Sequence, residues 1–333
     1  MDALESYFAA HVPGVRGPLT LSLITGGKSN LTYEVTDGHS RWVLRRPPLG
    51  TLTPTAHDMA REYRVVAALG RSGVPVARAV CYCPDPDVIG APFTVMSFVD
   101  GAVLRDGDLA ATLAPADARR CAEALVDELA RLHAVDPHEV GLADFGRPVG
   151  YLGRQVRRWR GQWSRVATRS LSTLDALHRA LERATPPESG AAIVHGDYRL
   201  DNAILDAGDP GTVRAIVDWE MATLGDPLAD LGLMLVYWDP VCAPVLGVRH
   251  APTANPGFPT GPELAARYAA RSGRDLSRLS FYRALGYLKL AVIAEGIHAR
   301  HLAGQTVGPG FDAVGSAVPA LLDAGLDTLG GSS

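Results

Sequence analysis

Three polar side chains in the second half of the chain have the residue types and the spacing that phosphoryl transfer requires. Such a transfer from ATP needs a carboxylate that orients the acceptor hydroxyl and accepts its proton, together with oxygen ligands that hold Mg²⁺ on the phosphates. Asp197 and Asn202 lie five positions apart in the segment HGDYRLDN, and Asp218 directly follows the apolar residues Ile216-Val217. This order predicts Asp197 as the base and Asn202 and Asp218 as the metal ligands.

A single aspartate or asparagine in a turn is usually a turn former or a helix cap. The ordered set argues against that reading, because the offset between Asp197 and Asn202 equals the Asp-to-Asn offset of the kinase catalytic loop H-R-D-x-x-x-x-N. Asp218 then takes the place of the metal-binding aspartate on the following strand. We therefore interpret the three residues together as a kinase-type site.

The elements that must position this site change in character along the chain. The first hundred residues alternate apolar and polar residues with period two and contain one amphipathic helix, whereas the later residues have mainly helical periodicity. The predicted strands are Leu19–Ile24, Leu31–Val35, Arg41–Leu44, Val76–Cys83, Phe93–Val99, Ala192–Val194 and Ala215–Val217, the last two as a pair that carries the site. The predicted helices are His57–Leu69, Pro115–Ala134, Gly150–Arg169, Leu174–Thr185, Leu228–Tyr237, Pro262–Arg271, Leu279–His301 and Phe311–Leu329. The Pro-rich stretch 239–261 is predicted to be a substrate loop or a lid.

Length and composition are those of a globular protein with two parts. The chain has 333 residues, of which 47% are hydrophobic and 20% charged, and about 150 residues per domain gives two domains or lobes. The net charge of −4 argues against a general nucleic-acid binder. Four cysteines in a chain of this length form no disulfide framework.

The sequence also contains no recognisable targeting or membrane segment. The N-terminus carries acids and lacks a basic region followed by an apolar one. The most apolar stretch, Ala284–Ile297, is interrupted by Lys289 and Glu295 and is predicted to be a buried helix rather than a membrane span. We expect a cytoplasmic protein without a membrane or nucleic-acid partner.

Beyond the catalytic motif, the sequence resembles the aminoglycoside phosphotransferase and choline kinase type of protein-kinase-like enzymes. The motif H-G-D-x-x-x-x-N, followed by a strand ending in Asp, is typical of that family. Further similar segments are GGKSN (26–30), WVLRRP (42–47), HDMAREY (57–63), MSFVDG (96–101), residues 150–159 and GDPLADL (225–231). They look most like the kinase-like domain found alone or fused to acyl-CoA dehydrogenases.

The resemblance implies an α+β, two-lobed protein-kinase-like fold with ATP between the lobes. Residues 1–99 would form the small nucleotide-binding lobe, with an antiparallel sheet and a helix, and residues 100–333 the larger, mainly helical lobe with the catalytic and acceptor sites. The implied nucleotide-binding residues are Gly26, Gly27 and Ser29 over the phosphates and Met96, Phe98 and Val99 at the adenine. From sequence alone, the first three also fit a plain hairpin turn and the last three an edge strand.

The residue expected to hold the α- and β-phosphates departs from the family pattern. It is normally a strand lysine paired with a helix glutamate, and Glu62 fits the second position. The chain has only two lysines, Lys28 and Lys289, and Arg45 stands where the strand lysine is expected. Arginine keeps the charge but has a planar, forked head group. We interpret Arg45 as the phosphate anchor, with Lys28 as the alternative.

Three residues close to the motif are assigned supporting roles. His195 is expected to order the catalytic loop through hydrogen bonds rather than to transfer protons. Asp226 and Asp230 are expected to support the loop and cap a helix.

The acceptor is indicated by a run of arginines. Residues 151–169 contain six arginines and no acidic residue, and a helix would place most of them opposite its apolar stripe. These arginines could form an ordinary solvent-exposed helix face. Alternatively, Arg154, Arg157 and Arg158 could belong to a site that binds an anionic acceptor. A polycationic aminoglycoside would favour carboxylates instead.

These observations favour an ATP- and Mg²⁺-dependent kinase for a small-molecule hydroxyl, such as a hydroxyacyl-CoA or another anionic metabolite, with a functional link to an acyl-CoA dehydrogenase. The alternatives are an aminoglycoside or choline-like amino-alcohol kinase and a nucleotide-binding pseudokinase with a regulatory role. The presence of Asp197, Asn202 and Asp218 argues against the pseudokinase, and only Arg45 supports it.

Overall fold

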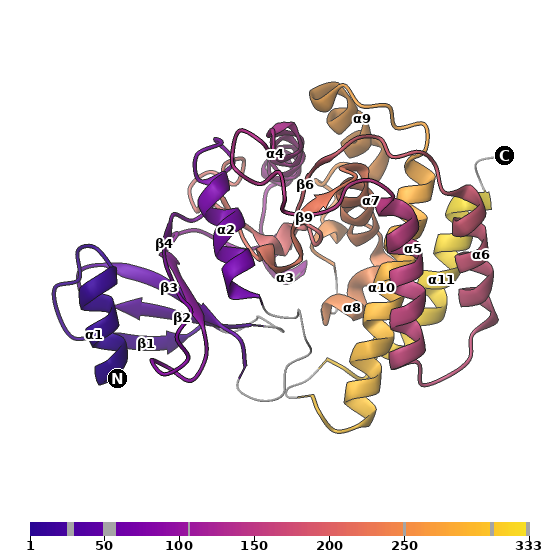
Figure 1. The fold of residues 1–333 in the computed structure, drawn as a ribbon. Helices are drawn as coiled ribbons and strands as arrows, with labels where there is room; N and C mark the ends of the chain where they lie inside the picture. Colours follow the sequence, from indigo (N-terminus) through magenta and orange to yellow (C-terminus); the bar gives the residue numbers. More distant parts are fainter. Residues whose placement is uncertain (25–29, 49–57, 106, 249–250, 307–309, 331–333) are drawn as a thin grey trace.

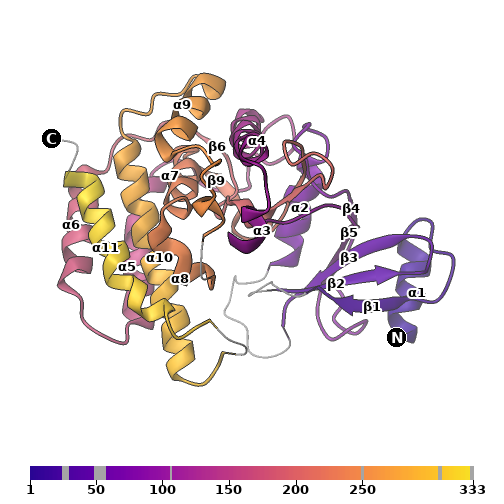
Figure 2. The ribbon, with the colours of Figure 1, turned by 180° about the vertical axis from the view of Figure 1, so that it is seen from behind.

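An antiparallel sheet at the N-terminal end and a larger set of helices make up an α+β fold (Figure 1). The computed structural model describes residues 1–24, 30–48, 58–105, 107–248, 251–306 and 310–330. The sheet lies at one end of the molecule and the C-terminal helices at the other, as the view from behind also shows (Figure 2). The fold class expected from the sequence is confirmed.

The N-terminal sheet has the strand order β1-β2-β3-β5-β4. Its strands are β1 (Thr20–Leu23), β2 (Leu31–Thr36), β3 (Arg41–Arg46), β4 (Ala79–Cys83) and β5 (Phe93–Ser97), and each neighbouring pair is antiparallel. Alternate residues, including Val35, Trp42, Leu44 and Val95, are buried with Phe8 in a separate apolar cluster. Phe8 belongs to helix α1 (Asp2–His11), which the sequence analysis missed.

Helix α2 (Met59–Leu69) lies between β3 and β4 in the sequence and packs against β4 and β5 of the sheet and against η2 (Trp219–Met221) of the later part. The carboxylate of Asp58 accepts the backbone N–H of Arg61 at 3.0 Å and so caps the N-terminus of the helix. Val65, Val66 and Leu69 are buried in the larger hydrophobic core together with the C-terminal helices. The apolar face of α2 therefore connects the two parts, and the boundary at residue 99 stays a prediction.

The larger part is built around a long buried helix. Helix α10 (Leu279–Leu302) packs against its neighbours α5, α6, α7 and α11, and Lys289 and Glu295 are buried within it. The other helices of this part are α3 (Gly107–Ala111), α4 (Pro115–Ala134), α5 (Tyr151–Val166), α6 (Ser172–Ala184), α7 (Leu228–Tyr237), α8 (Ala243–Leu246), α9 (Gly261–Ser272) and α11 (Val314–Gly330). The expected long helices are thus present, whereas α3 was not predicted.

The strand pairing around the catalytic motif differs from the expectation. Ala192–Val194 (β6) pairs with β9 (Thr223–Gly225), and β7 (Ala203–Leu205) pairs with β8 (Val213–Ile216). The prediction that Ala192–Val194 pairs with Ala215–Val217 was wrong, because two further three-residue strands, too short for a periodic pattern, supply the partners.

The Pro-rich stretch 239–261 is more ordered than a plain loop. It contains η3 (Pro240–Cys242), helix α8 and η4 (Pro252–Ala254), because proline suits the first positions of a helix. In the described part of the chain, no single helix has the length and hydropathy of a membrane span, although α7 and Pro240–Leu246, which meet at a bend of 80°, reach these criteria together.

Candidate active site

The catalytic loop begins where β6 ends, at Val194. Gly196 has a φ of +84°, and a Cβ added there would lie 2.7 Å from the carbonyl oxygen of Met221. Only glycine fits both the left-handed backbone and the close approach. The turn at Gly196 therefore sets the path of the chain from β6 to Asp197.

Two buried carboxylates lie near the loop, and one of them contacts it directly. Asp230 on α7 accepts the backbone N–H groups of His195 and Gly196 at 2.6 and 2.8 Å. Asp226 accepts the backbone N–H of Leu228 at 3.0 Å at the start of α7 and the hydroxyl of Tyr282 at 2.9 Å. Asp230 thus holds the loop through two backbone N–H groups, whereas the hydrogen bonds of Asp226 lie at the start of α7 and reach Tyr282 on α10 rather than the loop.

His195 is fully buried within the loop. Its Nε2 donates to the carbonyl of Val217 at 2.9 Å, and its Nδ1 accepts the backbone N–H of Asp197 at 3.2 Å. The ring also lies against Trp219, with 4.6 Å between the centroids. Because both ring nitrogens are engaged with the backbone, this arrangement orders the loop and leaves neither nitrogen for proton transfer.

The carboxylate of Asp197 lies between donors. Oδ1 accepts the hydroxyl of Tyr237 at 2.8 Å, and Nε of Arg199 lies 3.3 Å from Oδ2. Burial alone would raise the pKa of Asp197, but the positive charges of Arg199 and Lys289 and the Tyr237 hydrogen bond outweigh it and lower the pKa. Asp197 is therefore ionised at neutral pH, as a base must be.

Asn202 and Asp218 are brought together by the short hairpin. Val217 donates its backbone N–H to the carbonyl of Asn202 at 2.9 Å, which places Asp218 beside Asn202. Nδ2 of Asn202 donates to the backbone carbonyl of Asp197 at 2.8 Å and to its Oδ2 at 3.2 Å. The amide is thereby oriented, and its Oδ1 accepts no hydrogen bond from the described residues.

Asp218 has an unusual backbone conformation. Its φ of 68° is the only positive value among the described non-glycine residues, and strained backbone of this kind concentrates at functional sites. Its Oδ1 accepts from Arg45, while Oδ2 has no hydrogen-bond partner in the described chain. The described residues contain no group of three or more His, Cys, Asp or Glu side chains that could hold a metal. Two oxygen donors do fit Mg²⁺, which is commonly held by one or two carboxylates and the substrate phosphates.

Arg45 occupies the position expected for the strand lysine. Its two terminal nitrogens donate to Glu62 on α2 and, at 3.0 Å, to Asp218. Both Arg45 and Glu62 are buried, and burial raises the pKa of Glu62 against the opposing charge of Arg45. The guanidinium thus connects the sheet, helix α2 and the predicted metal site through two different nitrogens. A lysine would have only one nitrogen for both partners.

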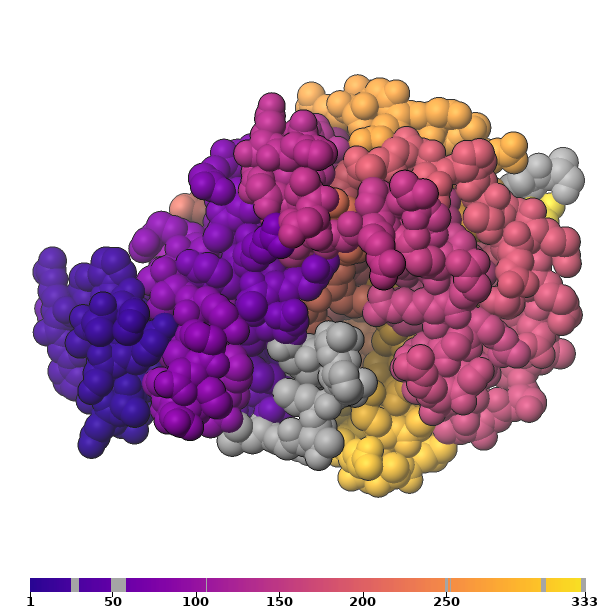
Figure 3. All heavy atoms as spheres, viewed as in Figure 1, coloured from indigo at the N-terminus to yellow at the C-terminus, as the bar shows by residue number. Residues whose placement is uncertain are grey.

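The residues predicted to contact adenine lie at the end of β5 and directly after it. Met96 is buried near the end of β5, and Phe98 donates its backbone N–H to the carbonyl of Arg41 at 3.2 Å. Val99 follows directly. Figure 3 shows a hollow between this N-terminal part and the later helices. Gly26, Gly27, Lys28 and Ser29 lie outside the described residues, so their predicted roles stay predictions.

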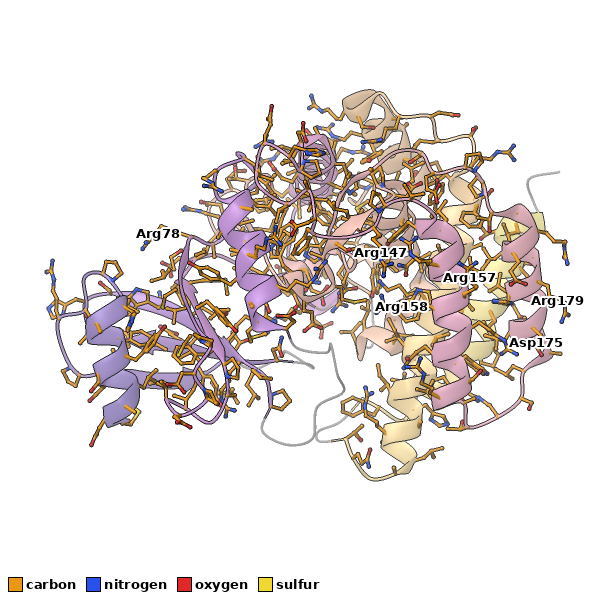
Figure 4. All side chains as sticks on the ribbon, in the orientation of Figure 1. Arg78, Arg147, Arg157, Arg158, Asp175 and Arg179 are labelled. Atoms are coloured by element: carbon orange, nitrogen blue, oxygen red, sulfur yellow. The ribbon has the colours of Figure 1, made fainter. Side chains whose placement is uncertain are left out.

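The arginines of α5 divide into two groups. Arg154 donates to the backbone carbonyls of Arg147 and Val149, Arg160 pairs with Asp175 at 2.7 Å, and Arg169, beyond the helix, pairs with Glu295 at 2.9 Å. Arg157 and Arg158 are exposed and form no ion pair within the described ranges. Figure 4 places Arg158 on the side of α5 toward the N-terminal sheet. Arg157 and Arg158 thus remain candidates for the acceptor, whereas Arg154 closes the turn before the helix.

Three site residues were not singled out from the sequence. Tyr237 contacts Asp197 from the last turn of α7, Arg199 lies inside the motif itself, and Lys289 donates to the carbonyl of Gly196 from α10. Lys289 carried a signal, since it is one of two lysines and interrupts an apolar helix. Tyr237 carried none, because its contact depends on how α7 packs.

A family model and individual related sequences were compared with this chain, and they indicate the same protein family. The model of the phosphotransferase enzyme family matches residues 20–282. The acyl-CoA dehydrogenase family member 11 of Rattus norvegicus is 36% identical over 97% of this chain, and family member 10 of Mus musculus is 35% identical over 91%. The alignments cover 42% and 29% of those two proteins, so the chain spans less than half the length of these relatives.

Solved structures show the same fold. A Ralstonia eutropha protein described provisionally as an aminoglycoside phosphotransferase superposes with a TM-score of 0.85 at 32% identity, covering 99% of this chain and 98% of that one. A spectinomycin phosphotransferase, crystallised with ADP and spectinomycin, gives a TM-score of 0.63 at 12% identity, with 98% of each chain covered. At that identity the second similarity concerns the fold alone.

Proposed function

Since the chain belongs to the phosphotransferase enzyme family, we propose that it transfers the γ-phosphate of ATP to the hydroxyl group of a small molecule. The observation that carries this proposal is the convergence of Asp197, Asn202 and Asp218 with the Arg45–Glu62 pair. These residues come from both parts of the fold and provide a base, two oxygen ligands and a cation for phosphate.

In the proposed reaction, Asp197 accepts the hydroxyl proton while the acceptor oxygen bonds to the γ-phosphorus. The bond between that phosphorus and the β,γ-bridging oxygen breaks, and ADP leaves with the electron pair. Tyr237 and Asn202 hold the two carboxylate oxygens of Asp197 in place. Arg45 holds the phosphates from the strand side.

Asn202 Oδ1 and Asp218 Oδ2 are the oxygens that would hold Mg²⁺, since neither accepts a hydrogen bond from the described chain. When bound, the ion neutralises charge on the phosphates. Arg45 donates to the other oxygen of Asp218, Oδ1, at 3.0 Å and thereby orients this carboxylate toward the ion.

We propose an anionic acceptor, such as a hydroxyacyl-CoA. The exposed Arg157 and Arg158 support this choice, since neither has an ion-pair partner among the described residues. The names of the curated relatives also associate similar regions with acyl-CoA dehydrogenases. Phosphorylation would turn a poor hydroxide leaving group into a good one and so prepare a later elimination.

The second candidate is a kinase for aminoglycosides or amino alcohols, because the fold is shared with a spectinomycin phosphotransferase. Arginines near the acceptor side disfavour a polycationic substrate. The pseudokinase alternative lacks its usual support, since the chain retains the residues proposed as the base and as both metal ligands.

The test is transfer of labelled γ-phosphate from Mg·ATP to hydroxyacyl-CoAs, sugars, amino alcohols and aminoglycosides, with Asp197→Asn as the blank. Transfer to hydroxyacyl-CoAs that is absent in the blank would support the proposal. Transfer to amino alcohols or aminoglycosides alone would support the second candidate. Binding of ATP without transfer to any acceptor would favour the pseudokinase.

A further inference from the structure

Arg199 contacts the proposed base from within the catalytic loop. Its Nε lies 3.3 Å from Oδ2 of Asp197 and 3.1 Å from Oδ1 of Asp201. This buried nitrogen forms no aligned hydrogen bond with the described residues, so both contacts are ion pairs. One guanidinium is therefore shared between the proposed base and a second carboxylate.

The backbone of the loop explains why these side chains meet. Arg199 is extended, with φ −161° and ψ 168°, and alternate side chains of an extended segment point to the same side. The intervening Tyr198 is buried and donates its hydroxyl to a backbone carbonyl of α4 at 2.7 Å, so Asp197 and Arg199 point away from that core. The short 3-10 helix η1 (Leu200–Asn202) follows directly and brings Asp201 back to the same guanidinium.

Tyr237 completes a closed set of three contacts. Its hydroxyl donates to Oδ1 of Asp197 at 2.8 Å, and its ring lies against the Arg199 guanidinium, with 5.1 Å between Cζ and the ring centroid. A guanidinium within about 6 Å of an aromatic centroid is attracted to the ring. Asp197, Arg199 and Tyr237 thus contact one another in pairs, and each oxygen of the base faces a different member of the set.

These contacts restrict how the Asp197 carboxylate can turn. The last torsion of an aspartate is broad, so a carboxylate held by a single partner could rotate. Tyr237 holds Oδ1, while Arg199 and the Asn202 amide both lie at Oδ2. Rotation would break contacts at both oxygens, and a misplacement of about 1 Å can cost about 100-fold in rate.

We propose that Arg199 is a positioning residue that, together with Tyr237, holds the carboxylate of Asp197 in the orientation in which it accepts the hydroxyl proton. This inference rests on the proposed function for its effect on turnover. Arg199 transfers no proton itself, because a guanidinium stays protonated. Its terminal nitrogens Nη1 and Nη2 donate to none of the described residues, so the experiment must separate positioning from a direct contact with phosphate.

The experiment compares Arg199→Met, Arg199→Lys, Tyr237→Phe and the double variant Arg199→Met/Tyr237→Phe in the transfer of labelled phosphate. We expect Arg199→Met to lower kcat about 10- to 100-fold with KM for ATP and for the acceptor unchanged, and Arg199→Lys to recover part of the loss. Because both side chains act on one carboxylate, the double variant should lose less than the product of the two single losses. The control is Arg214→Met, since Arg214 pairs with Asp206 in the hairpin of β7 and β8 rather than with the base.

A crystal structure of Arg199→Met measures the orientation of the base directly. We expect the Asp197 carboxylate to have turned and its hydrogen bond from Tyr237 to be broken. An unchanged carboxylate or an unchanged kcat would overturn the positioning role. Weaker binding of ATP but not of ADP, measured by calorimetry, would overturn it too, because it would show that Arg199 binds the γ-phosphate instead.

Two arrangements keep the test decisive. If Arg199→Met does not fold, Arg199→Met/Asp201→Asn replaces it in every measurement, because that variant also removes the second carboxylate left without its cation. The crystal structure separates this inference from the proposed function. A turned carboxylate in a protein whose wild type phosphorylates no acceptor supports the positioning role and contradicts the kinase. Phosphoryl transfer that is insensitive to Arg199 does the reverse.

Discussion

Arg45 and Asp218 are 173 positions apart in the sequence and are joined by a hydrogen bond of 3.0 Å. The same guanidinium donates to Glu62 through its other terminal nitrogen. Strand β3, helix α2 and the predicted metal ligand are therefore connected through one side chain. Variants of Arg45 and Glu62 can therefore distinguish what this ion pair contributes to folding stability from what Arg45 contributes to nucleotide binding.

We predict that Arg45→Met destabilises the protein and weakens ATP binding. It leaves the 2% exposed Glu62 without its cation, which costs about 3–5 kcal/mol of unfolding free energy. The double variant Arg45→Met/Glu62→Met, which removes the buried charge, is expected to regain most of that stability. ATP binding by calorimetry should stay about 10- to 100-fold weaker in both. Recovery of ATP affinity in the double variant would contradict the phosphate role of Arg45.

We predict that Asp197→Asn lowers kcat about 100- to 10,000-fold while ATP binding is retained. The amide keeps the shape of the side chain but cannot accept the hydroxyl proton. The matched control is Asp201→Asn, since Oδ1 of Asp201 lies 3.1 Å from the same Nε of Arg199, whereas the Asn202 amide donates to Asp197. If Asp201→Asn abolished turnover and Asp197→Asn did not, the base would be assigned to the wrong carboxylate.

We predict that Asp218→Asn and Asn202→Ala raise the Mg²⁺ concentration needed for half-maximal activity. Each variant weakens or removes one of the two oxygen donors for a hard cation. Titration of Mg²⁺ at saturating ATP measures the effect, and Asp206→Asn, in the turn between β7 and β8, is the control. An unchanged Mg²⁺ requirement in both variants would exclude these residues as ligands.

We predict that Arg157→Glu/Arg158→Glu raises KM for an anionic acceptor and leaves KM for ATP unchanged. The two side chains are exposed on α5, so charge reversal there should repel an anion without disturbing the core. The control is Arg179→Glu, an exposed arginine on the neighbouring helix α6 (Figure 4). An unchanged acceptor KM would show that the arginines form only a solvated surface.

We predict that Glu295→Gln lowers stability at neutral pH by about 1–3 kcal/mol and that this difference disappears in acid. Burial would raise the pKa of Glu295, but hydrogen bonds from Thr168 and the ion pair with Arg169 lower it below its usual 4.5. The stabilisation is therefore complete above about pH 4.5 and is lost as the pH falls through the folded-state pKa. Denaturant unfolding at several pH values measures it. A constant difference down to low pH would contradict this assignment.

The sequence by itself determined most of the long elements and predicted the chemistry of the site. The order of Asp197, Asn202 and Asp218 predicted the three roles, and apolar periodicity predicted helices such as Pro115–Ala134 and Leu228–Tyr237 with their observed bounds. These features are local, because side-chain type, spacing and periodicity are properties of one segment. The resemblance to the kinase-like family likewise predicted the pairing of Glu62 with Arg45, which lies within β3.

The tertiary structure alone decided the short strand pairs and the surroundings of the base. Three-residue strands such as β6 and β9 have too few positions for a pattern, so their partners follow from the packing of the loop. Tyr237 and Lys289 reach the catalytic loop from α7 and α10, far away in sequence. Their contacts depend on how helices pack around one core, which short-range sequence patterns do not specify.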